Sequence, residues 1–353
     1  EGDVTKTTTQ AITVAKVLDR IAVTTPPNRT SYFSGEQFST AGMVVTAYYT
    51  DGSSGAVTGY TYSPTGALAA GNTTITVSYT EGDVTKTTTQ AIKVTTVNTT
   101  LDSNSWATIK AVSDAGKGDN YWDVGDTRNI VINGNVGESV YKNITIAAFI
   151  IGFNHNSIIE GNNKIHFQIG KISNKLIGLC DGRYGSSVSG SGYFSMNTYR
   201  TNAGGWNDSY MRKTLLGNSG TPSNSLLAAI SADLRAVMKD VRKFTDNTGG
   251  GADHVSYVTG ATDYLFLLAE FEYHGSRTYA NSAEKNYQKQ YDYYKAGNSK
   301  VHNRFENPES AVSAWTRSAY AGHNDTFCLV NTDGTPSSNY ADISRALAPG
   351  FAV

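Results

Sequence analysis

The chain has 353 residues, a length that predicts two or three domains whose cores are large enough to need no disulfide bonds. Only 17% of the residues are charged, and 29 Lys and Arg against 30 Asp and Glu leave a formal net charge of -1. This balance excludes the strongly basic surface expected of a partner for nucleic acid or for an anionic membrane. The longest apolar run, residues 144–153, is about half of the roughly 20 residues that span a bilayer, so we expect no membrane insertion.

An internal repeat marks the N-terminal part of the chain. Residues 1–12 and 81–92 both read EGDVTKTTTQAI, so a unit recurs 80 residues later and the first copy is a fragment. We therefore expect residues 1–16 to be the tail of a preceding repeat, and the chain to begin inside a longer protein.

Short alternating apolar runs lie between the two copies. They include Val45 and Ala47, and Ile75 and Val77, and turn signals such as Asp51-Gly52 separate them. This pattern predicts an all-β sandwich of about seven strands over residues 17–97. The segments GEQFSTAGMVVTAYYTDGS and TTITVSYTEGDVTKT resemble bacterial immunoglobulin-like domains. The resemblance implies a stalk or spacer; a ligand-binding role for this module is the alternative.

Residues 98–105 are polar and lack an apolar period, so we expect a linker there. A helix is then expected from a cap at residues 103–105 through Trp106 and Val112 to Gly116. Further elements are expected as strands at residues 129–132, 144–153 and 164–169, as helices at 210–216, 225–243 and 282–294, and as either type at 264–271. The mixture predicts an α+β domain over residues 106–353.

The sequence offers few candidates for catalysis or metal binding. His155, Glu160 and His166 would converge if their strands formed a hairpin around residues 161–162, and could then hold zinc. Turn and core roles explain these residues equally well, so we predict no metal, no cofactor and no catalytic residue. Cys180 and Cys328 either form one disulfide or are two packed thiols, and we favour the thiols.

Several runs in the second domain carry a more specific signal. WATIKAVSDAGKGDNYWDVGDTRNIVINGNV, FIIGFNHN, GGWNDSYMRKTLLG and AEKNYQKQYDYYKAG resemble a family of uncharacterised domains of gut bacteria and their phages. The end of the chain, residues 310–353, is similar to the variable region of proteins diversified by retroelements. That family has a C-type-lectin-like fold of the formylglycine-generating-enzyme type. The matching residues are Trp315, Arg317-Ser318, Phe327-Cys328, Val330 to Gly334 and Ala348 to Phe351.

The resemblance implies that one surface varies by replacement of adenines in Asn codons, which never yields Lys, Gln, Glu, Met or Trp. Every candidate position carries a permitted residue, and we predict that these positions, within a variable region of about residues 310–345, bind the ligand: Ala314, Thr316, Ala319, Tyr320, Ala321, Gly322, His323, Asn324, Asp325, Thr326, Leu329, Ser338, Asn339, Tyr340, Asp342 and Ile343. Ala314, Thr316 and Ala319 depart from the family pattern, and the resemblance implies that they are exposed.

Within this set, Tyr320 and Tyr340 are expected to contribute most of the contact energy, because a Tyr ring offers a large area and a polar tip. The alternative for Tyr340 is packing against Phe351. Trp315, Phe327 and Val330 are expected as buried anchors beneath.

The resemblance implies a ligand-binding protein rather than an enzyme. An immunoglobulin-like stalk would present a C-type-lectin-like domain on a phage exterior or a bacterial cell surface, where it would recognise a protein or glycan on a bacterial cell. Neither nucleic acid nor a membrane is an expected partner. Two alternatives remain open: a carbohydrate-binding adhesin with a fixed site, and an oxidase of the formylglycine-generating type, which would need reactive cysteines and copper.

Overall fold

A computed structural model describes residues 2–219, 223–249 and 253–353 of the chain. The chain divides into two compact units, Glu1–Val97 and Asn98–Val353, and the structure is mostly β, with several sheets and few helices. In these described ranges, every helix is too short or too polar to cross a membrane.

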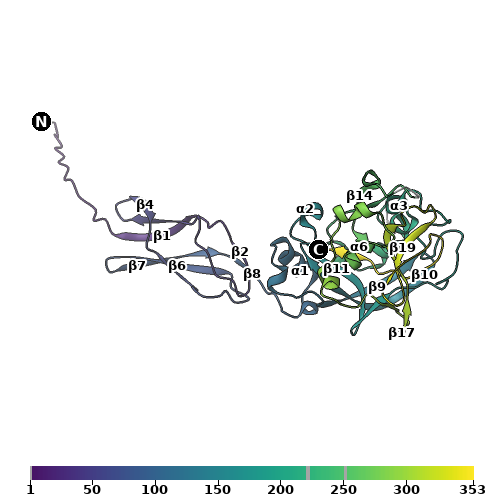
Figure 1. Cartoon of the computed structure of the whole chain (residues 1–353). Coiled ribbons are helices and arrows are strands. Elements are labelled where there is room, and N and C mark those ends of the chain that lie inside the picture. The colour runs from purple at the N-terminus through teal and green to yellow at the C-terminus, as the bar shows by residue number, and fades with distance from the viewer. Residues whose placement is uncertain (1, 220–222, 250–252) are drawn as a thin grey trace. The chain divides into compact units, whose positions relative to one another are not determined.

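The N-terminal unit contains two antiparallel three-stranded sheets and one parallel pair of strands (Figure 1). One sheet consists of β1 (Leu18–Thr25), β3 (Val44–Tyr49) and β4 (Ser54–Val57). The other consists of β5 (Thr61–Ser63), β6 (Thr74–Glu81) and β7 (Val84–Ala91), and the parallel pair is β2 (Ser31–Phe33) with β8 (Lys93–Thr95). Residues 2–17 precede β1 without regular secondary structure and are exposed.

The core of this unit follows the alternation that the sequence predicts. Val45 and Ala47 of β3 and Ile75 and Val77 of β6 are fully buried and belong to one hydrophobic cluster. Because successive side chains of a strand point to opposite faces, these alternate residues all reach the space between the two sheets. The predicted two-sheet packing is therefore present.

The second unit begins at residue 98, and the expected linker is folded onto it. Asn98 N–H donates to Asn104 Oδ1 (2.9 Å), and Asn104 Nδ2 donates back to the Asn98 carbonyl (2.9 Å). A 3-10 turn, η1 (Leu101–Ser103), lies between them. The helix α1 (Trp106–Asp114) follows, and the Ser105 hydroxyl caps it by accepting from Thr108 N–H (3.1 Å).

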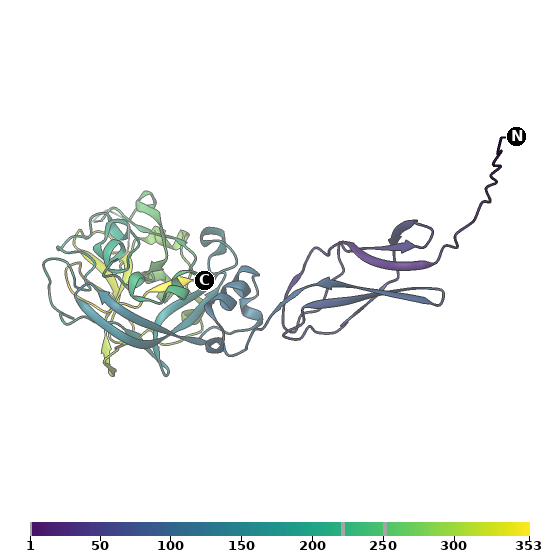
Figure 2. The same ribbon diagram turned by 180° about the vertical axis from the view of Figure 1, so that it is seen from behind.

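The largest sheet of the second unit has eight strands. They are β9 (Thr127–Val136), β10 (Ser139–Phe153), β11 (Ile165–Ile172), β12 (Lys175–Gly178), β15 (Leu265–Phe266), β16 (His302–Arg304), β17 (Asn307–Val312) and β21 (Gly350–Ala352). The long strands β9 and β10 curve across this unit in the view from behind (Figure 2). The C-terminal strand β21 pairs with both β11 and β15, so the end of the chain lies inside the sheet.

Two smaller sheets complete the second unit. One pairs β13 (Val241–Asp246) with β14 (Val258–Asp263), and the other orders β18 (Ala314–Ala319), β19 (Thr326–Val330) and β20 (Pro336–Tyr340). The helical elements are short: η2 (Gly118–Asn120), α2 (Ser157–Glu160), α3 (Gly205–Asp208), η3 (Met211–Leu215), α4 (Leu226–Ala229), α5 (Ala232–Arg235), η4 (Val255–Tyr257), α6 (Glu270–His274), η5 (Ser282–Asn286) and α7 (Asp292–Lys295).

Two of the predicted helices are wrong as continuous elements. The stretch 225–243 forms α4 and α5, and its end belongs to strand β13. It breaks at Ile230, which is extended (φ -75°, ψ 157°) and bridges to Ile132 of β9. The stretch 282–294 forms η5 and α7 with a break over residues 287–291, and Tyr291 at its end is also extended (ψ 143°). The apolar residues at helical spacing in these two stretches belong to several short elements, which pack against different neighbours.

Candidate functional site

A small pocket lies where the loop between β18 and β19 meets the end of β20. Its volume is about 270 Å³, and its lining consists of Tyr320, His323, Thr326, Ser338, Asn339 and Tyr340. We call it the C-terminal pocket. All six residues belong to the set predicted from the sequence to bind a ligand.

The exposure of the predicted residues separates them into three groups. Gly322, His323, Asn324 and Tyr340 are exposed, and Tyr320, Ala321, Asp325, Ser338, Asn339 and Ile343 are half-buried. The others are buried: Ala314, Thr316, Ala319, Thr326, Leu329 and Asp342. The structure therefore leaves ten of the predicted residues at least partly exposed, five of them in the C-terminal pocket, and buries the other six.

The predicted exposure of Ala314, Thr316 and Ala319 is wrong. All three belong to β18, in which every residue is buried, and the Thr316 hydroxyl donates to the Cys328 carbonyl (3.0 Å). Leu329 is 3% exposed because it lies in β19, between β18 and β20.

Two further predicted residues also lie inside. Asp342 is 8% exposed and accepts hydrogen bonds from the Ser187 hydroxyl and from Arg200. Thr326 is 6% exposed, but it still lines the C-terminal pocket. Apart from Thr326, the buried residues have too little exposed surface to contact a ligand directly, so they are not direct contact positions.

Aromatic rings form the walls of the C-terminal pocket. The Tyr320 ring stacks on His323 with 4.1 Å between centroids and meets Tyr279 edge-on at 5.1 Å. Tyr340 is 43% exposed, and the Arg200 guanidinium lies 3.9 Å from its ring centroid. The alternative packing of Tyr340 on Phe351 is wrong, because Phe351 stacks on Phe167 and contacts Trp106.

The loop of residues 320–325 is held through its backbone by a residue outside the predicted variable region. Asn202 is fully buried, and its Nδ2 donates to the carbonyls of His323 (2.7 Å) and Thr326 (2.9 Å). Its own N–H donates to the Asn324 carbonyl (2.9 Å). These contacts involve only main-chain atoms of the loop, so they do not depend on which side chains the loop carries.

A second support comes from Glu270. Its carboxylate accepts hydrogen bonds from the backbone N–H groups of residues 278–280, between 2.7 and 3.2 Å. The Tyr279 carbonyl in turn accepts from Ala321 N–H (2.9 Å). Burial raises the pKa of Glu270, and the three donors oppose that rise.

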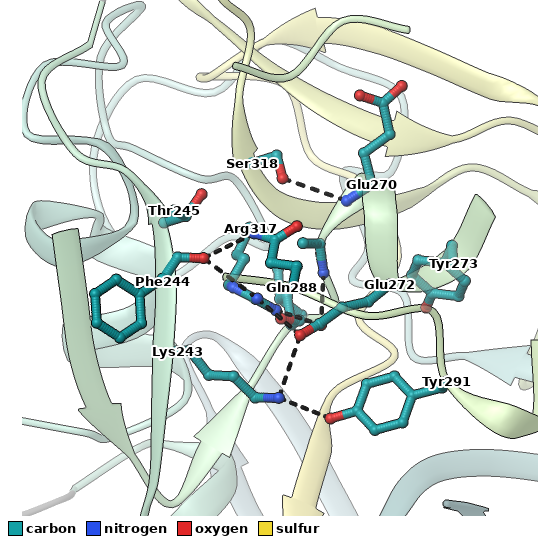
Figure 3. Close-up of polar contacts among 12 residues, drawn as sticks. Lys243, Phe244, Thr245, Glu270, Glu272, Tyr273, Gln288, Tyr291, Arg317 and Ser318 are labelled. Carbon is teal, nitrogen blue, oxygen red and sulfur yellow. Dashed lines mark hydrogen bonds and ion pairs between the residues drawn. The ribbon is translucent and has the colours of Figure 1, made fainter. Parts of the chain in front are cut away.

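A chain of buried charges connects β18 with α6 and β13 (Figure 3). Arg317 of β18 binds both carboxylate oxygens of Glu272, and Lys243 of β13 lies 3.3 Å from Glu272 Oε1. Lys243 Nζ also donates to both oxygens of Glu160 (2.8 Å each) and to the Tyr291 hydroxyl (2.7 Å). We call Glu160, Lys243, Glu272 and Arg317 the ion network. Its two cations balance its two anions.

The pKa shifts of the carboxylates show that the charges of the ion network depend on one another. Burial on its own would raise the pKa of Glu160 and Glu272. At Glu160 the Lys243 ammonium and the His166 imidazole together outweigh burial, and at Glu272 the Arg317 guanidinium and Lys243 together do so, and both pKa values therefore lie below their ordinary range. Arg317 is fully buried, yet the Glu272 carboxylate raises its pKa. The two carboxylates and the Arg317 guanidinium are therefore charged.

The histidines of the zinc alternative lie beside this network. His166 Nε2 is 3.1 Å from Glu160 Oε2, and His155 stacks on Tyr291 with 3.7 Å between centroids. Donor atoms of His155, Glu160 and Glu272 lie within 4.8 Å of one another. The Lys243 ammonium already lies within hydrogen-bonding distance of both carboxylates, so a divalent ion would have to displace it.

Both cysteines are free and buried. Burial raises the pKa of Cys180 to about 12 and raises the pKa of Cys328 well above its ordinary value. Because the thiolate is the reactive form, we expect neither thiol of the native protein to react with Ellman's reagent at pH 8. Both should react after denaturation in guanidinium chloride. Fast reaction of one thiol equivalent in the native protein would contradict this prediction.

Several residues that build the site carry no signal in the sequence. Asn202 stands in a polar, glycine-containing stretch typical of a loop, and Glu272 follows an apolar run as an ordinary helical Glu. Lys243 lies on the same buried side of β13 as Val241 and Thr245, where a Lys is not expected. The alternation in residues 241–246 is the one signal for this strand.

Comparison with known families covers this part of the chain. Residues 190–353 match the model of a family described as a domain of unknown function, DUF6273. The matched segment includes the C-terminal pocket, Asn202 and three of the four residues of the ion network, but not Glu160. A search of curated proteins finds no match to the chain.

Proposed function

We propose that this chain is a ligand-recognition protein of a phage exterior or a bacterial cell surface. In this proposal, residues 17–97 are an immunoglobulin-like stalk and residues 106–353 are a C-type-lectin-like domain. The C-terminal pocket and the loop of residues 320–325 form the recognition surface, and a retroelement diversifies it. The partner is a molecule on a bacterial cell surface.

One observation carries the proposal: six of the sixteen residues that the variable-region pattern selects in the sequence line one pocket in the structure. They come from the loop of residues 320–325 and from two neighbouring strands, so the chain must fold before they meet. Among the predicted positions, we assign to the recognition surface the exposed and half-buried ones, together with Thr326, which lines the pocket.

The frame around the pocket supports the same function. Trp315, Phe327 and Val330 are fully buried in the strands that flank the loop, and Asn202 holds the loop by main-chain contacts. A paratope needs this combination, because a rigid scaffold must keep its geometry while Tyr, Ser, Asn and His side chains change around it.

The oxidase alternative receives less support from the structure. An oxidase of that type requires reactive cysteines, whereas burial disfavours the thiolate form of both Cys180 and Cys328.

Binding to cells tests the surface directly. We expect Tyr320→Ala and Tyr340→Ala each to weaken binding of the labelled protein to a bacterial strain that it recognises by about 30-fold or more, as for interface hot spots. Tyr264→Ala is the matched control, since Tyr264 is 46% exposed but lies outside the pocket. Equal affinities for all three variants would contradict the proposed recognition surface.

The DNA beside the gene tests diversification. We expect a second, nearly identical copy of the coding sequence for residues 310–353, with differences confined to adenines of that copy. The differences should fall on the codons of the C-terminal pocket and of the loop of residues 320–325. Absence of such a copy, or differences spread over all bases, would refute diversification while leaving ligand recognition open to the binding test.

A further inference from the structure

A second pocket adjoins the C-terminal pocket. Its volume is about 380 Å³, and its lining includes Asn197, Thr198, Tyr199, Asp208, Tyr210 and Lys213. We call it the neighbouring pocket. All of its lining residues lie between 197 and 214, outside the region that the sequence predicts to vary.

Arg200 connects the linings of the two pockets. Arg200 lies over the Tyr340 ring of the C-terminal pocket at 3.9 Å and forms an ion pair with Asp342 (3.4 Å). Tyr199, the preceding residue, lines the neighbouring pocket. The Cα atoms of these two consecutive residues are only about 3.8 Å apart, so the linings of the two pockets lie close together.

The neighbouring pocket is built rigidly except for one ring. Asn197 Nδ2 donates to the Thr201 carbonyl (2.6 Å), and Asn197 Oδ1 accepts from Tyr210 N–H (3.0 Å). The Tyr210 hydroxyl accepts from Gly192 N–H (2.7 Å). Tyr199 is 71% exposed, so its ring offers a large apolar area that a ligand would remove from water.

The linings of both pockets are polar but carry no unbalanced charge among the described residues. The C-terminal pocket has hydroxyl, amide and aromatic groups. In the neighbouring pocket the two charged residues, Asp208 and Lys213, form an ion pair with each other (2.6 Å). Hydroxyls both donate and accept hydrogen bonds, and aromatic faces cover apolar C–H surfaces. Each volume is near or below the lower end of the roughly 300–1,000 Å³ typical of ligand pockets, so each accommodates one small ring.

We propose that the two pockets bind consecutive units of an uncharged saccharide chain, with the neighbouring pocket as a fixed subsite. This inference rests on the proposed function and deepens it by naming the ligand class. The fixed subsite recognises a sugar unit through Tyr199, and the C-terminal pocket selects among chains through its variable side chains. A sugar ring suits both pockets because it combines an apolar face with a rim of hydroxyls.

The test uses the full chain and a bacterial strain that it binds. Periodate treatment of the cells, which cleaves sugar diols, should abolish binding, and proteinase K treatment should leave it intact. Polysaccharide purified from that strain should compete, and fragments of two or more units should compete at least about tenfold better than single sugars. Tyr199→Ala should weaken binding to the polysaccharide about tenfold, and Tyr264→Ala should not.

The outcomes separate this inference from the proposed function. Loss of binding after proteinase K but not after periodate overturns the saccharide assignment while the recognition function stands. Unchanged binding by Tyr199→Ala, with Tyr340→Ala impaired, overturns the fixed subsite. Unchanged binding by Tyr320→Ala and Tyr340→Ala refutes the proposed function itself. Circular dichroism and thermal unfolding of each variant confirm that it is folded.

Discussion

Replacing Lys243 by Met is expected to destabilise the C-terminal unit by about 3–5 kcal/mol, the cost typical of breaking a buried ion pair. Lys243 is 1% exposed, and its ammonium is the cation nearest to Glu160 and also contacts Glu272. Without it, Glu160 stays buried in a site that no longer compensates its charge. Since domains are stable by about 5–15 kcal/mol, the loss removes a large part of the total. Equilibrium unfolding in guanidinium chloride measures it.

The neighbouring residue supplies the matched control. Arg242 is exposed on the other side of β13, so Arg242→Met should change the free energy of unfolding by less than about 1 kcal/mol. Adding Glu160→Gln to Lys243→Met should recover about 1–3 kcal/mol relative to the sum of the single changes. If Lys243→Met is as stable as Arg242→Met, the ion network does not hold the domain together.

Replacing His155 by Phe is expected to make the protein less sensitive to acid. Burial lowers the pKa of His155 to about 3, from an ordinary value of 6.5. A group whose folded pKa is depressed contributes stability above its unfolded pKa and loses it as the pH falls. Between pH 6.5 and 3, the unfolded chain takes up a proton at His155 that the folded chain does not.

The effect is about 2 kcal/mol between pH 8 and pH 5, because each pH unit below 6.5 costs about 1.4 kcal/mol. Relative to the unmodified protein, His155→Phe should therefore gain about 2 kcal/mol when the pH changes from 8 to 5. Phe keeps a ring to stack on Tyr291. Burial also raises the pKa of Glu270 and Glu284, but these groups are present in both proteins and cancel in the difference. If the difference in unfolding free energy between His155→Phe and the unmodified protein is the same at pH 8 and at pH 5, the prediction is wrong.

Under the proposed function, the ion network accounts for which positions near the end of the chain can change and which cannot. Arg317 points into the domain and binds Glu272, and the Ser318 hydroxyl donates to Glu284 (2.7 Å). β18 is thereby anchored immediately before the loop of residues 320–325. Side chains beyond Ala319 are attached to this anchored strand, so they can change while the backbone keeps its course.

A strand or helix that packs one face against a single neighbour could be predicted from its local sequence pattern. The alternation of Val45 and Ala47 placed β3, and the Ser105 cap placed α1. It failed for residues 225–243, where apolar side chains at helical spacing contact several different neighbours. The family pattern failed for Ala314, Thr316 and Ala319, because it does not indicate that the rest of the chain covers both sides of β18. The pocket residues were predicted, but not the main-chain contacts from Asn202 that hold them.

The repeated peptide separates what the sequence determines from what only tertiary structure decides. Residues 81–92 and residues 1–12 are identical, and their alternating Thr-rich pattern gives both the same preference for extended backbone. In the second copy, β7 pairs along its length with β6, whereas residues 2–12 remain exposed and without a partner strand in the described chain. Strand preference is local, but a strand is completed only by hydrogen bonds to a neighbour, and that neighbour is supplied by the fold. The same holds for Lys243. The sequence specifies its charge, but only the packed domain buries that charge between Glu160 and Glu272.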